Sequence, residues 1–395
     1  MKLINAIKHS LRICNKKTNW SFFIIFKYNL MGDKMNKKMD YILLFSVVLL
    51  CLFGLMMIYS SSSIWAQYKF NNSYHYVINQ FIFFIIGLFI MIIISKINYN
   101  VYFKYSNYIL LICFILLILV LIPGIGSVRN GSRSWFGIGG FGVQPSEACK
   151  IGLIIFTSKY LSLNDRYIKS FIKGVLPILL VLLIFFGLIM LQPDLGTGFI
   201  LFLSIISILF IAGVNLNFFI IGGVLGLIGI IVLIIIAPYR MNRIISFIDP
   251  WKDALGTGFQ IIQSLYAIGP GGLLGTGYLN SVQKHFYLPE PQTDFIFSII
   301  CEEFGVVGSI IVVFLFLIIF YRGIKIALEC SDSFSKYLCF GIIFQLIFQT
   351  ILNLFVVIGL IPVTGVTLPF ISYGGSSLLI SMASIGIILN ISRFI

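Results

Sequence analysis

Long uninterrupted runs of apolar residues follow one another along most of the chain, separated by short polar segments. Each run is close to the roughly 20 residues that an α-helix needs to cross a bilayer. The runs predict ten helices, near residues 41–60, 77–95, 107–122, 147–163, 175–191, 197–213, 216–237, 295–321, 337–361 and 376–392. They do not alternate as barrel strands would, so only helices satisfy the backbone in lipid. The sequence therefore predicts an all-α, polytopic integral membrane protein.

Composition and the placement of charge agree with this fold class. Apolar residues make up 59% of the 395 residues, charged residues 10%, and the mean hydropathy is +1.05, which excludes a soluble globular protein. Alternate sides of the predicted spans carry 19 and 7 Lys and Arg residues, with Lys150 left inside a span. We therefore expect both termini in the cytoplasm. The net charge of +14 reflects this bias and predicts contact with anionic inner-leaflet lipid, not nucleic acid.

Four familiar features, a disulfide framework and three kinds of functional site, are not indicated. The seven Cys and three His residues show neither paired nor metal-ligand spacing, so no disulfide framework or zinc site is expected. Residues 137–142 match a nucleotide-binding glycine pattern but lack a βαβ context. Residues 281–284 match S-x-x-K without the companion motifs of a serine acyl-enzyme.

Residues 1–39 differ from the rest of the chain. They are basic, are expected to be cytoplasmic, and contain a short aromatic segment at 20–25 that is typical of an interfacial helix. Later methionines, the last of them Met39, offer other start sites. The first 30 residues are therefore either a genuine segment or an extension of the gene model. Residues 40–395 are expected to form the membrane domain.

Two long loops are predicted on the outer side, at 123–146 and at 238–293, the second between helices 7 and 8. Nucleotide-activated substrates are not normally available there, so a site on that side needs a substrate that is already activated. The loops carry four arginines whose guanidinium groups suit phosphate oxygens: Arg129, Arg133, Arg240 and Arg243. The alternative is that these side chains reach lipid headgroups.

Several carboxylates lie at or inside the ends of predicted spans: Glu147, Asp194, Asp294, Glu302 and Glu303. A charged side chain near the bilayer centre costs about 2.5–3.5 kcal/mol on insertion scales, which marks these positions as candidate functional sites. The simplest role for Asp294, Asp194 and Ser146 is to cap a helix. A carboxylate at such a position can also act as a general base.

Helical spacing relates some of these residues to each other. Glu302 and Glu303 lie about two turns beyond Asp294, so one of them is expected to share its face. Lys150 lies three residues after Glu147, on the same face. That pair is either a buried ion pair or a source of positive charge for a phosphate site.

The motifs together resemble those of the SEDS family of shape, elongation, division and sporulation proteins, typified by RodA, FtsW and SpoVE, and most closely its FtsW/SpoVE branch. The matching stretches are GSRSW at 131–135, QPSE at 144–147, QPDLGT at 192–197, YR at 239–240 with Arg243, FIDPW at 247–251, GFQ at 258–260, LPEPQTDFIF at 288–297 and the loop at 359–377. The resemblance runs from about residue 41 to residue 393.

The resemblance implies a peptidoglycan glycosyltransferase that polymerises lipid II at the outer face of the cytoplasmic membrane, during cell division or sporulation. It implies that Asp294 is catalytic. The substrate-binding residues it implies are Arg133, Trp135, Glu147, Lys150, Gln192, Asp194, Arg240 and Arg243. The implied partners are a class B penicillin-binding protein and other division or sporulation membrane proteins.

This reaction needs a base for the acceptor hydroxyl and positive charge for the leaving pyrophosphate. A divalent cation, Mg²⁺ or Mn²⁺, bound at Asp294 or Asp194 would also suit the pyrophosphate. Two other functions stay open: a lipid II flippase, and a non-enzymatic scaffold for a penicillin-binding protein. The clustering of charge at the outer end, away from the midplane, favours the enzyme over a transporter.

Overall fold

The computed structural model describes residues 38–129, 131–138, 141–236 and 238–395, so all but the last two residues of the predicted 1–39 segment lie outside the described residues. A helix lies at each of the ten predicted positions. These helices are α3 (Tyr41–Phe70), α4 (His75–Ile94), α5 (Asn100–Leu121), α6 (Pro145–Leu163), α7 (Leu176–Met190), α8 (Leu195–Ile211), α9 (Leu216–Ile236), α12 (Ile296–Glu329), α13 (Ser333–Val357) and α14 (Gly375–Ile391).

Many of these helices have the dimensions of membrane spans. Within the described residues, six helical segments are long and apolar enough to cross a bilayer: α3, α4, α5, Phe171–Met190, α12 and α13. The first five residues of the Phe171–Met190 segment, Phe171–Val175, form a π-helical turn that leads into α7. Helices α8 and α14 are apolar but shorter. The protein is a multi-pass helical membrane protein, and the count of ten crossings stays a prediction.

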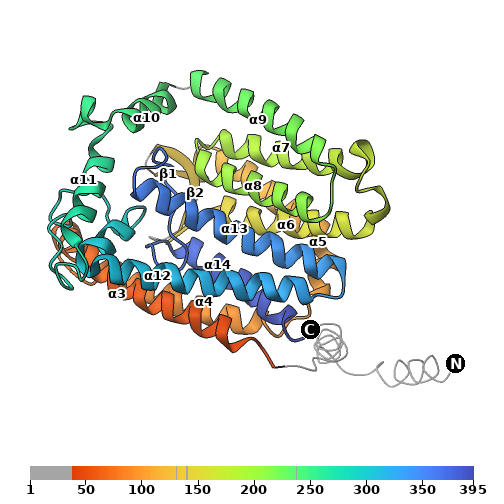
Figure 1. Ribbon diagram of the computed structural model, residues 1–395, viewed down its shortest axis with the longest axis horizontal. Coiled ribbons are helices and arrows are strands. Elements are labelled where there is room, and N and C mark those ends of the chain that lie inside the picture. The colour runs from red at the N-terminus through yellow and green to blue at the C-terminus, as the bar shows by residue number, and fades with distance from the viewer. Residues whose placement is uncertain (1–37, 130, 139–140, 237) are drawn as a thin grey trace.

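Helix α13 lies at the centre of the bundle (Figure 1). It packs against α6, α8, α12 and α14, while α4 packs on α14 and α5 on α6. In the apolar stretch of α13, 67% of the residues are buried inside the protein, compared with 22% in the corresponding stretches of α4 and α5. Helices α4 and α5 therefore lie at the periphery. Polar side chains on α13 are therefore held inside the protein.

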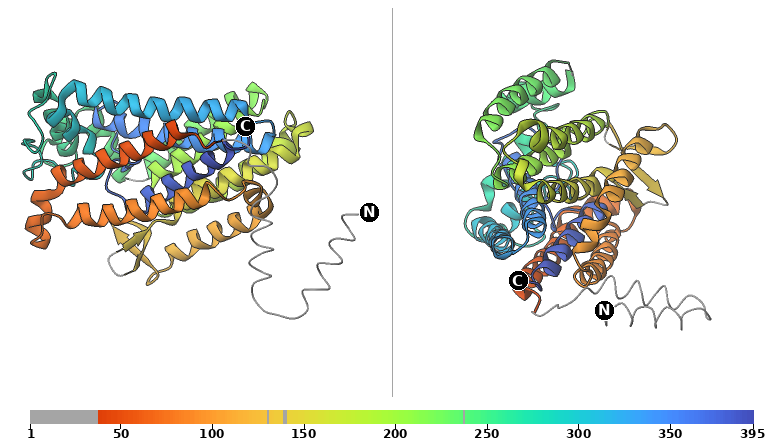
Figure 2. Two further views of the ribbon diagram at one scale, coloured as in Figure 1. Left: turned by 90° about the horizontal axis from the view of Figure 1, so that it is seen from below. Right: turned by 90° about the vertical axis from the view of Figure 1, so that its right-hand side faces the viewer.

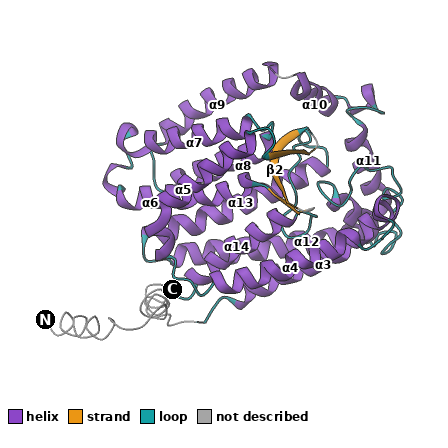
Figure 3. Cartoon of the chain, turned by 180° about the vertical axis from the view of Figure 1, so that it is seen from behind, coloured by secondary structure: helices purple, strands orange, loops and turns teal. Residues whose placement is uncertain are grey.

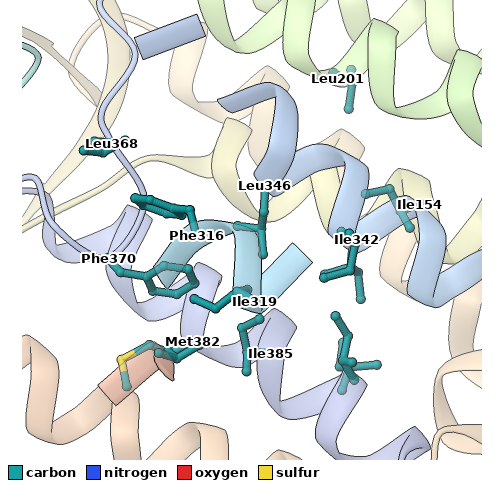
Figure 4. Packing of buried hydrophobic residues seen from close by; sticks show 14 of the residues in the cluster. Ile154, Leu201, Phe316, Ile319, Ile342, Leu346, Leu368, Phe370, Met382 and Ile385 are labelled. Carbon is teal, nitrogen blue, oxygen red and sulfur yellow. The ribbon is translucent and has the colours of Figure 1, made fainter. Parts of the chain in front are cut away.

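The loop between α13 and α14 enters the core. Its Leu368 and Phe370 are buried with residues of α12, α13 and α14 (Figure 4). Gly196, at the start of α8, lies against Thr364 and Val366 of the same loop. The loop therefore connects the first turn of α8 to the centre of the bundle.

The 123–146 loop contains a small sheet that the sequence did not predict. Its three antiparallel strands are β1 (Gly126–Arg129), β2 (Ser132–Ile138) and β3 (Phe141–Val143), in the order β1-β2-β3. Gly137 pairs with Gly142 across β2 and β3, so these two glycines of the 137–142 pattern belong to the sheet. Figure 3 shows the sheet (orange) at the end of α8 and α13 that faces α10 and α11.

The 238–293 loop contains two short helices, α10 (Pro238–Ile248) and α11 (Phe259–Ile268). Its glycine-rich part lies against a kink in α12 at Gly305, where φ is 61°. Four backbone hydrogen bonds join loop and kink: Thr276 N to Glu302 O (2.9 Å), Gly277 N to Glu303 O (3.0 Å), Val306 N to Gly272 O (3.0 Å) and Val307 N to Leu273 O (3.1 Å). The loop thus supplies partners for backbone groups of the interrupted helix.

Both ends of the described chain lie at the same end of the bundle, opposite α10, α11 and the sheet (Figures 1 and 2). The Asp40 N–H donates to Ser392 Oγ (3.2 Å), which joins the start of α3 to the end of α14. The Asp40 carboxylate also pairs with Arg322 near the end of α12 (2.5 Å). This arrangement fits an even number of membrane crossings.

Candidate functional site

Asp294 lies two residues before α12, where it does not cap the helix. The helix begins at Ile296, and its N-cap position is occupied by Phe295, which makes no side-chain cap. The capping interpretation of Asp294 is therefore wrong. Its side chain is partly exposed, and within the described part of the chain its carboxylate accepts no hydrogen bond.

The backbone around this carboxylate is fixed by its neighbours. Asn353 Nδ2 donates to the carbonyl of Asp294 (2.7 Å). The Ser372 hydroxyl donates to the carbonyl of Thr293 (2.6 Å), and the Tyr373 N–H donates to that of Gln292 (2.8 Å). Asp294 is thus presented from a rigid segment with its carboxylate free to react.

The surroundings of Asp294 make it a stronger base than an ordinary aspartate. Burial is the largest cause and, with the nearby negative charge of Glu290, raises its pKa to about 6. The Arg243 guanidinium opposes this rise, and the Asp194 charge adds to it. A carboxylate with this pKa is ionised at neutral pH and accepts a proton more readily than usual.

Asp194 does cap a helix, as one interpretation of the sequence predicted. One carboxylate oxygen accepts a hydrogen bond from the N–H of Thr197 in the first turn of α8 (3.1 Å). The other accepts a hydrogen bond from Gln144 Nε2 (2.9 Å). Burial raises the pKa of Asp194, and the bonds from Thr197 oppose the rise. Its two oxygens are engaged, so Asp194 shapes the site more than it offers a free base.

Glu147 and Lys150 form the buried ion pair that their spacing suggested. Lys150 Nζ lies 2.9 Å from Glu147 Oε1 and 3.0 Å from Gln349 Oε1 on α13. The Lys150 side chain is only 1% exposed. Ser146 does not cap α6, because Gln144 occupies the N-cap position and makes no side-chain bond there.

The arginines predicted to bind substrate lie differently from one another. Arg243 is exposed, donates to the carbonyl of Val363 (3.1 Å) and acts electrostatically on Asp294. Arg133 Nη1 contacts the carbonyl of Leu121 at the end of α5 (3.5 Å). Trp135 lies on β2, half-buried. The side chain of Arg240 lies outside the described residues.

Gln192 belongs to a set of buried polar groups around these residues. Ser132 Oγ donates to its carbonyl, but both atoms of its side-chain amide lack a partner among the described residues. The other unpaired buried atoms nearby are Ser146 Oγ, Glu147 Oε2, Asn353 Oδ1 and Thr364 Oγ1. Buried polar groups are nearly always hydrogen-bonded, so this lining suits a polar ligand.

Glu302 and Glu303 form a second cluster, separate from the residues that hold Asp294. Glu303 pairs with Lys284 (3.2 Å) and accepts Ser60 Oγ of α3 (2.5 Å). Glu302 accepts hydrogen bonds from Ser281 Oγ (2.5 Å) and from backbone N–H groups of the 238–293 loop. The expectation that one glutamate shares the face of Asp294 is not supported by these contacts. The S-x-x-K match at 281–284 reflects this packing.

The sequence interpretation missed Gln349 and Asn353. Both are buried and bonded to residues of the site. The available signal was a stripe of amides, Gln345, Gln349 and Asn353, at four-residue spacing on an otherwise apolar helix. Such a stripe lies on one helix face and is costly to expose to lipid.

The protein alone offers no complete metal site in the part of the chain that is described. No group of three or more His, Cys, Asp or Glu residues there could hold a metal ion. Mg²⁺ commonly binds through one or two carboxylates together with substrate phosphates. Asp294 and Asp194 could therefore bind a metal ion only together with phosphate groups of the substrate.

Known proteins match nearly all of the described chain. The FtsW/RodA/SpoVE family, described as cell cycle proteins, matches residues 41–395. Stage V sporulation protein E of Bacillus subtilis (strain 168) is 48% identical over 355 residues, which cover 90% of this chain and 97% of that protein. A probable peptidoglycan glycosyltransferase FtsW of Geobacter sp. (strain M18) is 40% identical over 353 residues, which cover 89% of this chain and 96% of that protein.

Two solved structures share the fold. One is a chain of a peptidoglycan synthase complex that coordinates polymerization and crosslinking, with a TM-score of 0.74, 30% identity and coverage of 90% of this chain and 98% of that one. The other is the rod shape determining protein RodA of Thermus thermophilus, with a TM-score of 0.67, 27% identity and coverage of 90% and 97%. The helical bundle is therefore common to these proteins.

Proposed function

Because the chain belongs to the FtsW/RodA/SpoVE family of cell cycle proteins, we propose that it is a peptidoglycan glycosyltransferase that polymerises lipid II during cell division or sporulation. Lipid II is a disaccharide-peptide carried on undecaprenyl pyrophosphate. The observation that carries the proposal is Asp294: a carboxylate without hydrogen bonds among the described residues, on a fixed backbone, with a pKa raised to about 6. That is the form of a general base.

In the proposed reaction the 4-hydroxyl of the acceptor GlcNAc attacks C1 of the donor sugar. A new C1–O bond forms, the bond from C1 to the pyrophosphate oxygen breaks, and the configuration at C1 inverts. Asp294 takes the hydroxyl proton as the nucleophile forms its bond. The lipid pyrophosphate leaves with the bonding electron pair.

Positive charge near the site would stabilise the leaving group. Arg243 is an exposed cation whose charge acts on Asp294, so it is placed to meet a pyrophosphate oxygen. Lys150 is buried and acts through its charge. The unpaired side-chain atoms of Gln192, Ser146 and Thr364 would contact sugar hydroxyls and amides.

The count of Lys and Arg supports an outward-facing site. The end of the bundle that holds the described termini carries the larger positive charge, so Asp294 and the 238–293 loop face outside the cytoplasmic membrane. A class B penicillin-binding protein would crosslink the strands made here. The likeness to a chain of a peptidoglycan synthase complex supports that pairing.

Purified protein with fluorescent lipid II tests the activity directly. An enzyme forms glycan polymer in detergent without any penicillin-binding protein. Because a detergent solution has no bilayer, this assay does not measure lipid flipping. A flippase moves lipid II across vesicle membranes without forming polymer, and a scaffold does neither. Absence of polymer from folded wild-type protein would contradict the proposal.

The pH dependence of the rate reports the base. Since only the carboxylate form of Asp294 accepts a proton, and its pKa is about 6, kcat/KM should be flat above that pH and fall about tenfold per unit below it. An ordinary aspartate would place this limb near pH 4. A pH–rate profile of polymerisation from pH 4.5 to 8 distinguishes the two.

A divalent cation belongs to the proposal as a companion of the substrate. Mg²⁺ or Mn²⁺ would be held by pyrophosphate oxygens and one carboxylate, Asp294 or Asp194, and would neutralise leaving-group charge. Polymerisation should fall at least about tenfold in EDTA and return when Mg²⁺ or Mn²⁺ is restored. An unchanged rate in EDTA would remove the cation from the proposal and leave the base in place.

A further inference from the structure

Two buried amide side chains on α13 contact both parts of the site. Gln349 and Asn353 are four residues apart, so they lie on one face of the helix, one turn from each other. Their exposed fractions are 1% and 0%. Helix α13 is the central element of the bundle, which makes this face a rigid reference for the groups bonded to it.

Asn353 holds the peptide that carries the proposed base. Its Nδ2 donates to the carbonyl of Asp294 (2.7 Å) and to the carbonyl of Val366 (2.8 Å). Only the amide nitrogen can donate twice, so the orientation of the side chain is fixed. The carbonyl of Asp294 precedes α12, so Asn353 supplies a partner that the helix does not.

Gln349 makes the equivalent connection to the ion pair. Its Nε2 donates to the carbonyl of Thr367 (3.1 Å), and its Oε1 accepts from Lys150 Nζ (3.0 Å). Val366 and Thr367 are consecutive, so the two amides bind the same short stretch of the loop between α13 and α14. One amide continues to Asp294 and the other to Lys150 and Glu147.

We propose that Gln349 and Asn353 act together as positioning residues, which set the separation between the Asp294 carboxylate and the Lys150–Glu147 pair across the Val366–Thr367 backbone. The inference rests on the proposed function. A misplacement of about 1 Å in a catalytic group can cost about 10²-fold in rate. The amides therefore contribute to catalysis through Asp294 and Lys150, without contact with the substrate.

Steady-state polymerisation by alanine variants tests this role. Asn353→Ala should lower kcat about 10- to 100-fold, with KM for lipid II within about twofold, because the base moves while binding is kept. Gln349→Ala should lower kcat about tenfold. Gln345→Ala is the matched control: Gln345 is a buried amide one turn earlier on α13, with no hydrogen bond to the site among the described residues. Its kcat should stay within about twofold of wild type.

The double variant separates positioning from general destabilisation. Since both amides act through the same loop, Gln349→Ala with Asn353→Ala should lose less than the product of the single losses. Wild-type kcat in Asn353→Ala, or losses that multiply, would overturn the inference. If Asn353→Ala does not fold, Asn353→Leu keeps about the same volume, removes both donors without adding a charge and should lose kcat as strongly. Failure of the proposed function looks different: wild type makes no polymer, or Asp294→Asn stays active.

Discussion

Replacing Asp294 with asparagine should lower the rate of lipid II polymerisation about 10²- to 10⁴-fold, the usual contribution of a general base. The substitution keeps the size and shape of the side chain but removes its basicity. KM should change little, because the amide can still contact an acceptor hydroxyl. The measurement is polymer formed from fluorescent lipid II by purified protein.

The fold should survive this change, because the carboxylate has no hydrogen bond to lose among the described residues. Burial raises its pKa from 3.8 to about 6, so the folded protein binds its proton more tightly than the unfolded chain does. Stability from this group is therefore present at low pH and is lost as pH rises from about 4 to about 6. At pH 7 Asp294→Asn should unfold at the same temperature as wild type or slightly above it.

A matched variant shows whether the loss is specific. Asp165 is an exposed aspartate just beyond the end of α6, while Glu147 and Lys150 lie at the start of that helix. Asp165→Asn should polymerise lipid II within about twofold of wild type, since exposed substitutions far from a site rarely matter. Asp294→Glu should recover part of the activity with the base displaced by one methylene. Polymerisation by Asp294→Asn above a tenth of the wild-type rate would exclude Asp294 as the base.

The positions of the helices could be predicted because lipid imposes a simple constraint. A span needs a continuous apolar run, and the runs at 107–122 and 376–392 correspond to α5 and α14 within a few residues, apart from the polar start of α5. Helix α3 continues ten residues beyond the predicted end at 60. Its last ten residues mix apolar and aromatic side chains with three serines, Gln67 and Lys69, so apolar content alone does not mark the true end.

The family suggested by the motifs is confirmed by the match over residues 41–395.

The contacts of the site could be predicted only in part. Local spacing was enough for Glu147 with Lys150, and for Asp194 at the start of α8, because both depend on neighbours in the same helix. Asp294 was ambiguous, since capping depends on the residue at which the helix begins, and α12 begins one residue too late for it. The partners of Asn353 come from two other segments of the chain. No periodicity in one segment can indicate them.

Replacing Lys284 with methionine should destabilise the protein by about 3–5 kcal/mol, the usual cost of breaking a buried ion pair from one side. Lys284 Nζ donates to Leu279 O (2.6 Å), Glu303 Oε1 (3.2 Å) and Ser60 Oγ (3.3 Å), and the side chains of Lys284 and Glu303 are 3% and 0% exposed. Without the ammonium, Glu303 keeps a buried charge that has no counterion. Thermal unfolding in detergent should therefore occur at a clearly lower temperature.

Two further variants identify the cause of this loss. Adding Glu303→Gln to Lys284→Met removes the stranded charge and should restore much of the stability, because a neutral pair avoids the desolvation of a lone carboxylate. Lys325→Met breaks an exposed pair with Glu329 (3.9 Å) on the same helix α12 and should cost no more than about 1 kcal/mol. If Lys284→Met unfolds like Lys325→Met, the cluster does not hold the 276–284 loop to the kink at Gly305. If it unfolds early and the double variant recovers, that loop is fastened to α12 by charge as well as by backbone bonds, just after the segment that presents Asp294.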